Sequence, residues 1–283
     1  MSQRIGLVAA FSKPEASVLA QDISVWLTAR GWEIVPEARL TEDASQVVDA
    51  IIVLGGDGLM MRAANAYPDT PLLGINFGKV GFLALVERKN WESALECFIA
   101  GDYRMEEGST LAATLIRDGI EDDQGWVIND VVIRGGPRMI DVEVYIDGHF
   151  VNTYPGDGMI VSTPRGSTAY CMAAGGPILT AGVRGFAIVP ISCHSPIRTP
   201  MVVAESAQVE LVAANRHESQ LILDGRTVAQ LEFGDVVKIR QGVHTFKLIA
   251  VGGTSFYDAF RTKFNFSIRP DAVPTRQPAQ NNG

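Results

Sequence analysis

Residues 51–58 read Ile-Ile-Val-Leu-Gly-Gly-Asp-Gly, an apolar run that ends in three glycines around one carboxylate. Four branched apolar side chains without polar alternation predict a strand buried on both faces, as in the parallel sheet of an α/β domain. Residues 59–66 favour a helix and lack proline, so the glycines form the loop between strand and helix. Glycines permit positive φ, keep Cβ atoms away from a ligand and offer free amides to phosphate oxygens. The phosphate or donor contacts predicted from this loop are Gly55, Gly56 and Gly58.

Asp57 is the unexpected member of this loop. Phosphates repel a carboxylate, so its presence points to a substrate hydroxyl or a Mg²⁺ ion. A general base must come within about 3 Å of the proton that it removes. The alternative is that Asp57 caps the helix and that Asp-Gly forms an ordinary turn. The loop alone leaves both interpretations open.

The sequence around this loop alternates between strand and helix patterns. Further strands are predicted at residues 5–10, 33–35 and 71–75. Residues 14–30 have apolar side chains at helical spacing. The pattern predicts an N-terminal doubly wound α/β domain over residues 1–102. Ligands in such sheets lie beyond the carboxyl ends of the strands, where residues 76–83 also fall; there Phe82 stacks on a base or belongs to the core.

From residue 103 onward the pattern changes to short alternating segments separated by Asp-Gly or other glycine turns. The predicted strands lie at residues 111–117, 126–134, 139–146, 209–212, 220–223 and 236–240. They indicate a second, β-rich, all-β-like domain over residues 103–252. Residues 253–266 predict a helix that returns to the first domain and completes it. The polar, proline-rich residues 267–283 predict a disordered tail.

A second polar segment lies inside this β-rich region. Residues 156–170 predict a strand, a hydroxyl-rich loop and a short helix that begins near Ser167 or Thr168. Asp157 suits a ribose hydroxyl or an amine, and Tyr170 combines a flat face with a hydroxyl. Taken alone, the segment is equally explained by an ordinary capped helix.

Asn129 and Asp130 are two consecutive polar residues in a predicted strand, so at least one of them faces the interior. A buried polar group needs a partner. A ligand and a structural hydrogen bond are both open.

Composition excludes several classes of protein. A net charge of −8 argues against a general nucleic-acid binder. The three cysteines show no CxxC spacing and the four histidines are scattered, so we expect no disulfide and no metal cluster made of protein ligands. No apolar run is long enough to span a bilayer, so we expect a cytoplasmic protein without a membrane partner.

Five segments, in this order and spacing, resemble NAD kinases of the bacterial type: residues 55–58, 76–83, 129–130, 157–170 and 175–178. The resemblance covers residues 5–264. Diacylglycerol, sphingosine and 6-phosphofructo-kinases share the first segment, whereas residues 163–170 are more specific to NAD kinases. The resemblance implies phosphorylation of the adenosine ribose 2′-hydroxyl of NAD by ATP or polyphosphate. It also implies Mg²⁺ or another divalent metal, and NADP as product.

The resemblance further implies roles for single residues. Asp57 is the base, Gly58 lies against the dinucleotide, and Asn129 and Asp130 meet the nicotinamide-side ribose. The adenine side is lined by Thr168, Ala169, Tyr170 and Ala173. Further nucleotide contacts are expected from Arg62, Phe82 and Arg138.

Asp157 is expected at the nicotinamide end, in this family often across a subunit interface, which implies a homodimer or homotetramer. Several residues depart from the family pattern, among them Leu59 and Phe77. Arg165 replaces a threonine or alanine and either adds a phosphate contact or alters the donor preference, and Asp130 replaces a longer glutamate.

Two alternatives stay open. A lipid or sphingoid kinase shares the glycine loop but has no use for residues 163–170. A non-catalytic dinucleotide sensor would keep the binding residues and has no need of Asp57.

Overall fold

The computed structural model describes residues 3–10, 13–42, 48–78, 81–180, 182–196, 198–252, 256–257 and 259–260. The N-terminal part is built on a parallel sheet in the order β2-β1-β3-β4. Its strands are β1 (Arg4–Ala9), β2 (Glu33–Pro36), β3 (Ala50–Leu54) and β4 (Leu72–Asn76), and the short β5 (Val86–Glu87) pairs with β4. Each predicted strand is therefore present.

Helices cover both faces of this sheet. Helices α1 (Pro14–Thr28) and α4 (Trp91–Ala100), the latter preceded by the 3-10 turn η1 (Arg88–Asn90), pack on one face. Helices α2 (Glu37–Glu42) and α3 (Asp57–Ala66) lie on the other. Strand β3 supplies Ile52 and Leu54 to the first core and Ile51 and Val53 to the second, which explains its lack of polar alternation. The doubly wound prediction is confirmed.

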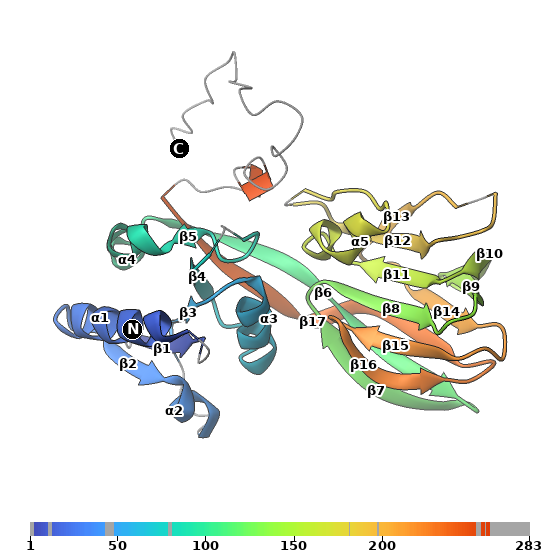
Figure 1. Ribbon diagram of the computed structural model, residues 1–283, viewed down its shortest axis with the longest axis horizontal. Coiled ribbons are helices and arrows are strands. Elements are labelled where there is room, and N and C mark those ends of the chain that lie inside the picture. Colours follow the sequence, from blue (N-terminus) through green and yellow to red (C-terminus); the bar gives the residue numbers. More distant parts are fainter. Residues whose placement is uncertain are drawn as a thin grey trace, which may run out of the picture.

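Two long antiparallel strands, β6 (Tyr103–Arg117) and β17 (Val236–Val251), continue the same sheet into the β-rich part (Figure 1). Strand β17 pairs with β4 at one end and with β14 (Val209–Ala213) at the other. The sheet is extended by β7 (Ile120–Val127), β9 (Ile140–Ile146) and β10 (His149–Gly156), and has eleven strands among the described residues. The predicted strand at residues 236–240 is thus too short, because an irregularity between Gln241 and Thr245 interrupts its pattern.

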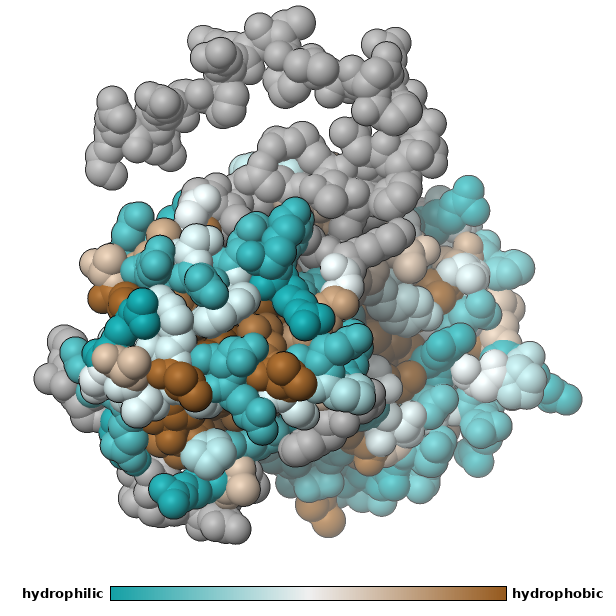
Figure 2. All heavy atoms as spheres, turned by 60° about the vertical axis from the view of Figure 1, so that its left-hand side comes forward, coloured by the Kyte–Doolittle hydropathy of each residue, from teal (hydrophilic) through white to brown (hydrophobic). Residues whose placement is uncertain are grey.

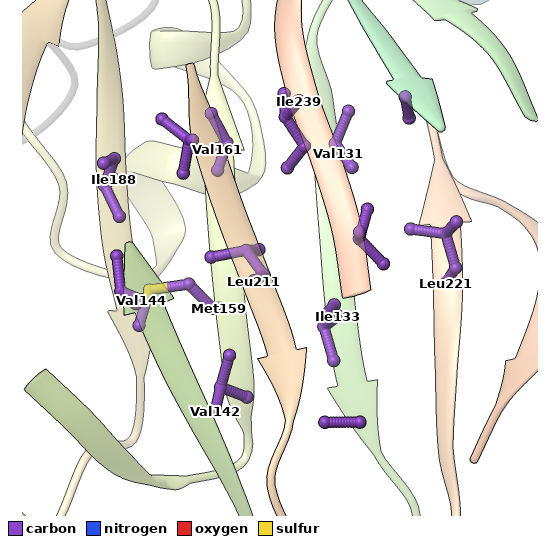
Figure 3. Packing of buried hydrophobic residues seen from close by; sticks show 14 of the residues in the cluster. Val131, Ile133, Val142, Val144, Met159, Val161, Ile188, Leu211, Leu221 and Ile239 are labelled. Atoms are coloured by element: carbon purple, nitrogen blue, oxygen red, sulfur yellow. The ribbon is translucent and has the colours of Figure 1, made fainter. Parts of the chain in front are cut away.

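The second sheet packs face to face against this extension. It has the order β13-β12-β11-β8-β15-β16. Its strands are β8 (Asp130–Gly135), β11 (Gly158–Ser162), β12 (Gly185–Ile191), β13 (Met201–Ala204), β15 (Ser219–Leu223) and β16 (Arg226–Leu231). Figure 3 shows Val131 and Ile133 of β8 in the core with Leu211 of β14 and Ile239 of β17. Since side chains alternate along a strand, Asp130 and Val132 face the opposite side.

The single strand predicted at residues 126–134 is wrong. The chain leaves the first sheet at Val127 and enters the second at Asp130. The amides of the intervening turn, Ile128 and Asn129, donate hydrogen bonds to the distant Asp224 carboxylate, which a local pattern does not reveal.

The predicted short helix after the hydroxyl-rich loop is present as the 3-10 turn η2 (Gly166–Thr168) followed by α5 (Tyr170–Ala173). Near the C-terminus, residues 256–257 and 259–260 are helical. The Phe256 ring lies 5.9 Å from that of Phe82, and Ala259 packs into the α3 core, so this segment does return to the first part of the chain. The rest of the predicted helix at 253–266 and the predicted tail at 267–283 lie outside the described residues.

The surface of the N-terminal part is mostly hydrophilic, with apolar residues visible between polar ones (Figure 2). Val18 and Val25 of α1 are the exposed apolar side chains on that helix. No helix in the described part of the chain is long and apolar enough to cross a membrane.

Candidate active site

The glycine loop ends at the first residue of α3. Gly56 is the N-cap, and Asp57 begins the helix. A Cβ atom at Gly56 or Gly58 would have no neighbour within 4 Å among the residues that the structure describes, whereas one at Gly55 would meet the Leu59 side chain. None of the three has a positive φ, so the expected use of left-handed backbone is wrong here. The glycines instead leave the space above the helix N-terminus open to a ligand.

The Asp57 carboxylate accepts hydrogen bonds from the loop that follows β4. Its Oδ2 accepts a hydrogen bond from the Phe82 amide at 2.9 Å. Its Oδ1 accepts the Leu83 and Ala84 amides at 3.0 and 3.1 Å. Gly56, and not Asp57, is the N-cap residue of α3, so the prediction that Asp57 is the capping residue is wrong. Backbone donors from the next β/α connection orient this carboxylate.

Gly81 makes this arrangement possible. A Cβ atom at this position would overlap both oxygens of the Asp57 carboxylate. Gly81 is buried, and its amide donates to the Ala84 carbonyl at 3.1 Å, which closes the loop beneath the carboxylate. The two loops that were predicted to face one another therefore touch through Asp57 and Gly81.

The turn that carries Asn129 and Asp130 lies against α3. The Asn129 Nδ2 atom is 3.2 Å from the Met61 sulfur, one helical turn after Asp57. The Thr163 hydroxyl donates to the Ile128 carbonyl at 2.6 Å and accepts the Gly166 amide at 3.0 Å. The turn thus contacts both α3, which begins within residues 55–58, and the predicted segment 163–170.

Asp130 is an acid in an apolar environment. Its side chain is only 5% exposed. Burial, and next the nearby Asp224 carboxylate, raise the pKa of Asp130 to about 7. Close to neutral pH this group therefore exists as donor and acceptor forms in comparable amounts, which is a useful property for recognising hydroxyl groups.

A cavity of about 330 Å³ lies between the loop after β4, the 164–168 loop and the middle of β6 and β17. Of the predicted residues it is lined by Phe82, Arg165 and Thr168, and it also contains Arg184, Glu205 and His244. The Arg165 guanidinium lies 2.9 Å from Glu106, and both side chains are nearly buried. Burial would raise the pKa of Glu106, but a hydrogen bond from Arg104 and the charge of Arg165 hold it below its usual value.

A second cavity of about 470 Å³ lies beyond α5, at the other end of β11. It brings Asp157, Tyr170 and Ala173 together with Arg134. Ala169 is the exposed residue that precedes α5. The predicted adenine-side residues are thus divided, with Thr168 facing the first cavity and Tyr170 and Ala173 the second.

Two predicted arginines do not join either cavity. Arg62 forms an ion pair with Glu37 of α2 at 2.5 Å. Arg138 is exposed in the turn after β8 and is not among the residues that line the two cavities. The Ser167 hydroxyl, expected to cap a helix, instead donates to the Pro164 carbonyl and accepts the Leu179 amide.

Several residues near the site carry no local sequence signal. The Asp69 carboxylate, in the turn after α3, accepts the Thr245 amide at 2.7 Å and lies 2.8 Å from His244 Nδ1. Asp224 looked like an ordinary residue of a hairpin turn, yet it binds the amides of residues 128–130. The Asp224-Gly225 sequence indicated a turn, but it gave no sign of these three hydrogen bonds.

The described residues contain no group of three or more histidine, cysteine or acidic side chains placed to hold a metal ion. Magnesium in phosphoryl-transfer sites is commonly bound by one or two carboxylates, water and the substrate phosphates. A carboxylate next to an open helix N-terminus, as at Asp57, is compatible with that mode.

Comparison with known proteins identifies the family of this chain. Residues 36–103 match the model of the ATP-NAD kinase N-terminal domain. Residues 128–251 match that of the ATP-NAD kinase C-terminal domain. The NAD kinase of Thermomicrobium roseum is 56% identical over 98% of this chain and 96% of its own length. That of Syntrophotalea carbinolica is 34% identical over 94% of this chain and its own full length.

Two solved structures share the fold. Yeast NADH kinase, solved with NADH, has a TM-score of 0.82 at 17% identity, covering 97% of this chain and 90% of its own. An NAD kinase from Archaeoglobus fulgidus, solved with ATP, has a TM-score of 0.73 at 24% identity, covering 92% of this chain and 98% of its own. The resemblance inferred from five short segments is confirmed, and none of these proteins is a lipid kinase. The chain therefore belongs to the NAD kinase family.

Proposed function

We propose that the chain transfers the terminal phosphoryl group of ATP, or of polyphosphate, to the 2′-hydroxyl of the adenosine ribose of NAD. The observation that carries this proposal is Asp57, a carboxylate oriented by three amides beside the open N-terminus of α3. Helix amides and the helix dipole stabilise phosphate at that position. A base and a phosphate site at the same place are what phosphoryl transfer to an alcohol requires.

In the proposed reaction the 2′-oxygen bonds to the terminal phosphorus while the bond from that phosphorus to the leaving oxygen breaks. The hydroxyl proton passes to the Asp57 carboxylate, and ADP leaves when ATP is the donor. Mg²⁺ bound with the donor phosphates would neutralise charge on them.

The remaining predicted contacts fit around this centre. We propose that Asn129 and Asp130, next to α3, meet a ribose. We further propose that Asp157, Tyr170 and Ala173 form an extended part of the dinucleotide site in the second cavity. Asp157 is exposed, as expected for a residue that serves a partner subunit in a homo-oligomer. Three unpaired cysteines accord with a cytoplasmic location.

The proposed reaction is tested by incubating the purified chain with NAD, ATP and Mg²⁺ and detecting NADP with an NADP-specific dehydrogenase. We expect NADP to accumulate, and we expect NAD and NADP, unlike sphingosine or diacylglycerol, to raise the melting temperature. Stabilisation by NAD without NADP from ATP, other triphosphates or polyphosphate would leave the dinucleotide sensor as the function.

Arg165 is proposed to contact the donor phosphates, because it lines the first cavity as a nearly buried cation. Arg165→Gln is expected to raise the KM for ATP about tenfold, since a hydrogen bond to a charged group is lost. The KM for NAD should change little. Steady-state kinetics with each substrate varied in turn measure both.

The matched control is Arg104→Gln. Arg104 also pairs with Glu106 but is 58% exposed and does not line the cavity. Equal changes in both variants would show that Arg165 acts only by neutralising Glu106.

A further inference from the structure

Asp224 lies in the Asp-Gly turn between β15 and β16, with a left-handed φ of 46°. Its Oδ2 accepts the Ile128 amide at 2.9 Å. Its Oδ1 accepts the Asn129 and Asp130 amides at 2.8 and 3.2 Å. One carboxylate thus binds three consecutive amides that lie 94 to 96 positions away in the sequence.

The carbonyl groups of the same turn are bound as well. The Thr163 hydroxyl donates a hydrogen bond to the Ile128 carbonyl at 2.6 Å, and the Thr163 amide donates one to the Asn129 carbonyl at 2.9 Å. The Asp224 amide donates to the Asp130 carbonyl at 3.1 Å. Every backbone donor and acceptor of residues 128–130 therefore has a partner, which leaves the turn one conformation. That conformation directs the Asn129 amide group to Met61 of α3.

The side chain of Asp130 emerges from this turn on the α5 side of the sheet. Val131 and Ile133 point into the core between the sheets, as Figure 3 shows, and Val132 packs with Cys171 on the opposite side. Among the described residues, burial and the charge of Asp224, and no hydrogen-bond donor, account for the raised pKa of the Asp130 carboxyl group. A buried carboxylate without a donor is a natural partner for ligand hydroxyls.

We propose that Asp224 is a positioning residue for the dinucleotide: it holds Asn129 and Asp130 in place and makes dinucleotide binding dependent on pH through its charge. The proposal rests on the function proposed above, in which Asn129 and Asp130 meet a ribose. Asp224 itself touches the turn and is not a substrate contact.

The direction of the pH dependence follows from the groups around Asp130. Burial and the Asp224 charge raise the pKa of Asp130 to about 7. Asp224 from the hairpin and Cys171 from α5 face the Asp130 side chain. Burial raises the pKa of the Cys171 thiol to about 11, so the thiol stays neutral. Burial raises the pKa of Asp224, and the amides of residues 128–130 and the charge of Arg226 oppose that rise. Above pH 7 the ionised Asp130 accepts two ribose hydroxyls, so affinity for NAD should rise between pH 6 and 8.

Asp224→Asn removes the negative charge and places an NH₂ group against one of the three amides. The Kd for NAD at pH 8 is expected to rise about tenfold, because one charged hydrogen bond is lost and the turn loosens. The midpoint of the pH dependence should move to lower pH, since the charge that opposes ionisation of Asp130 is gone. The kcat should stay within about threefold. Calorimetric titration with NAD from pH 5.5 to 8.5 and steady-state kinetics measure these quantities.

Asp147→Asn is the matched control. Asp147 occupies another Asp-Gly hairpin with a φ of 50°, and its carboxylate accepts the Gln208 amide at 2.9 Å. The Asp147→Asn variant should leave the Kd for NAD and the pH profile of that Kd unchanged.

A second variant, Asp130→Asn, keeps the proposal testable if Asp224→Asn does not fold. It removes the titrating group, so its NAD affinity should not vary around neutral pH. An Asp130→Asn profile like that of the wild type, or an Asp224→Asn variant with a lower melting temperature but an unshifted midpoint, would overturn the proposal. The same wild-type preparation must make NADP; if it does not, the proposed function fails, which is a distinguishable result.

Discussion

Replacement of Asp57 by asparagine is expected to lower kcat by roughly 10²- to 10⁴-fold, the usual contribution of a general base. Asparagine keeps the size of the side chain and one acceptor oxygen, so the space around Gly56 and Gly58 is unchanged. It cannot accept the hydroxyl proton. The Kd for NAD should therefore stay within about threefold. Initial rates of NADP formation and calorimetric titration with NAD measure the two effects separately.

The structure offers a control at the other end of the same strand. Asp49 precedes β3, and its carboxylate accepts the Arg4 amide at 3.0 Å. Asp49→Asn tests whether loss of one carboxylate that binds backbone amides is enough to slow the enzyme. Unchanged turnover in Asp57→Asn, or an equal loss in Asp49→Asn, would contradict the assignment of Asp57 as the base.

Gly81→Ala is expected to reduce kcat by about 10²-fold, although Gly81 itself does not touch the substrate. The new methyl group would occupy the position of the Asp57 carboxylate, which must rotate away or push the loop aside. A displacement of about 1 Å in a reacting group commonly costs a factor of this size. The measurement is kcat at saturating NAD and ATP, together with the melting temperature.

Gly78→Ala is the control in the same loop. Within the described part of the chain, a Cβ atom there would have only the Asn76 Oδ1 atom nearby, at 3.7 Å, so the variant should keep wild-type turnover. If Gly81 acts through Asp57, the double variant with Asp57→Asn should be no slower than Asp57→Asn alone. Additive losses would mean that Gly81 supports the enzyme in another way.

The shared sheet explains why these groups can be positioned so closely. Strand β17 pairs with β4 of the α/β part and with β14 of the β-rich part, so one strand passes through both. The Asn129 turn and α3 come from the two different parts, yet they meet at 3.2 Å. A continuous sheet limits motion between the parts, as a site assembled from both requires.

In the first part of the chain, local pattern was sufficient for the four parallel strands and for α1 and α3, but it did not indicate α2 or α4. The buried run of β3, its glycine loop and α3 were predicted, because burial on both faces removes polar residues from a parallel strand. The boundary between β7 and β8 was not, because the turn at Asn129 is held by Asp224 and Thr163, which lie far away in the sequence. Likewise, residue type suggested Arg165 as a cation for phosphate, but nothing local indicated its pairing with Glu106, 59 positions away.

The sequence by itself determined the family, the doubly wound order of the N-terminal elements and the chemical identity of the groups around Asp57. These are properties of residue type and short spacing, which the chain carries in every conformation. Only the tertiary structure decided what those groups touch: the loop amides on Asp57, the carboxylate beside Asp130, and the separation of Thr168 from Tyr170 into two cavities. Hydrogen bonding and the polarity around a carboxyl group depend on which distant strands become neighbours, and that pairing arises only when the sheets form.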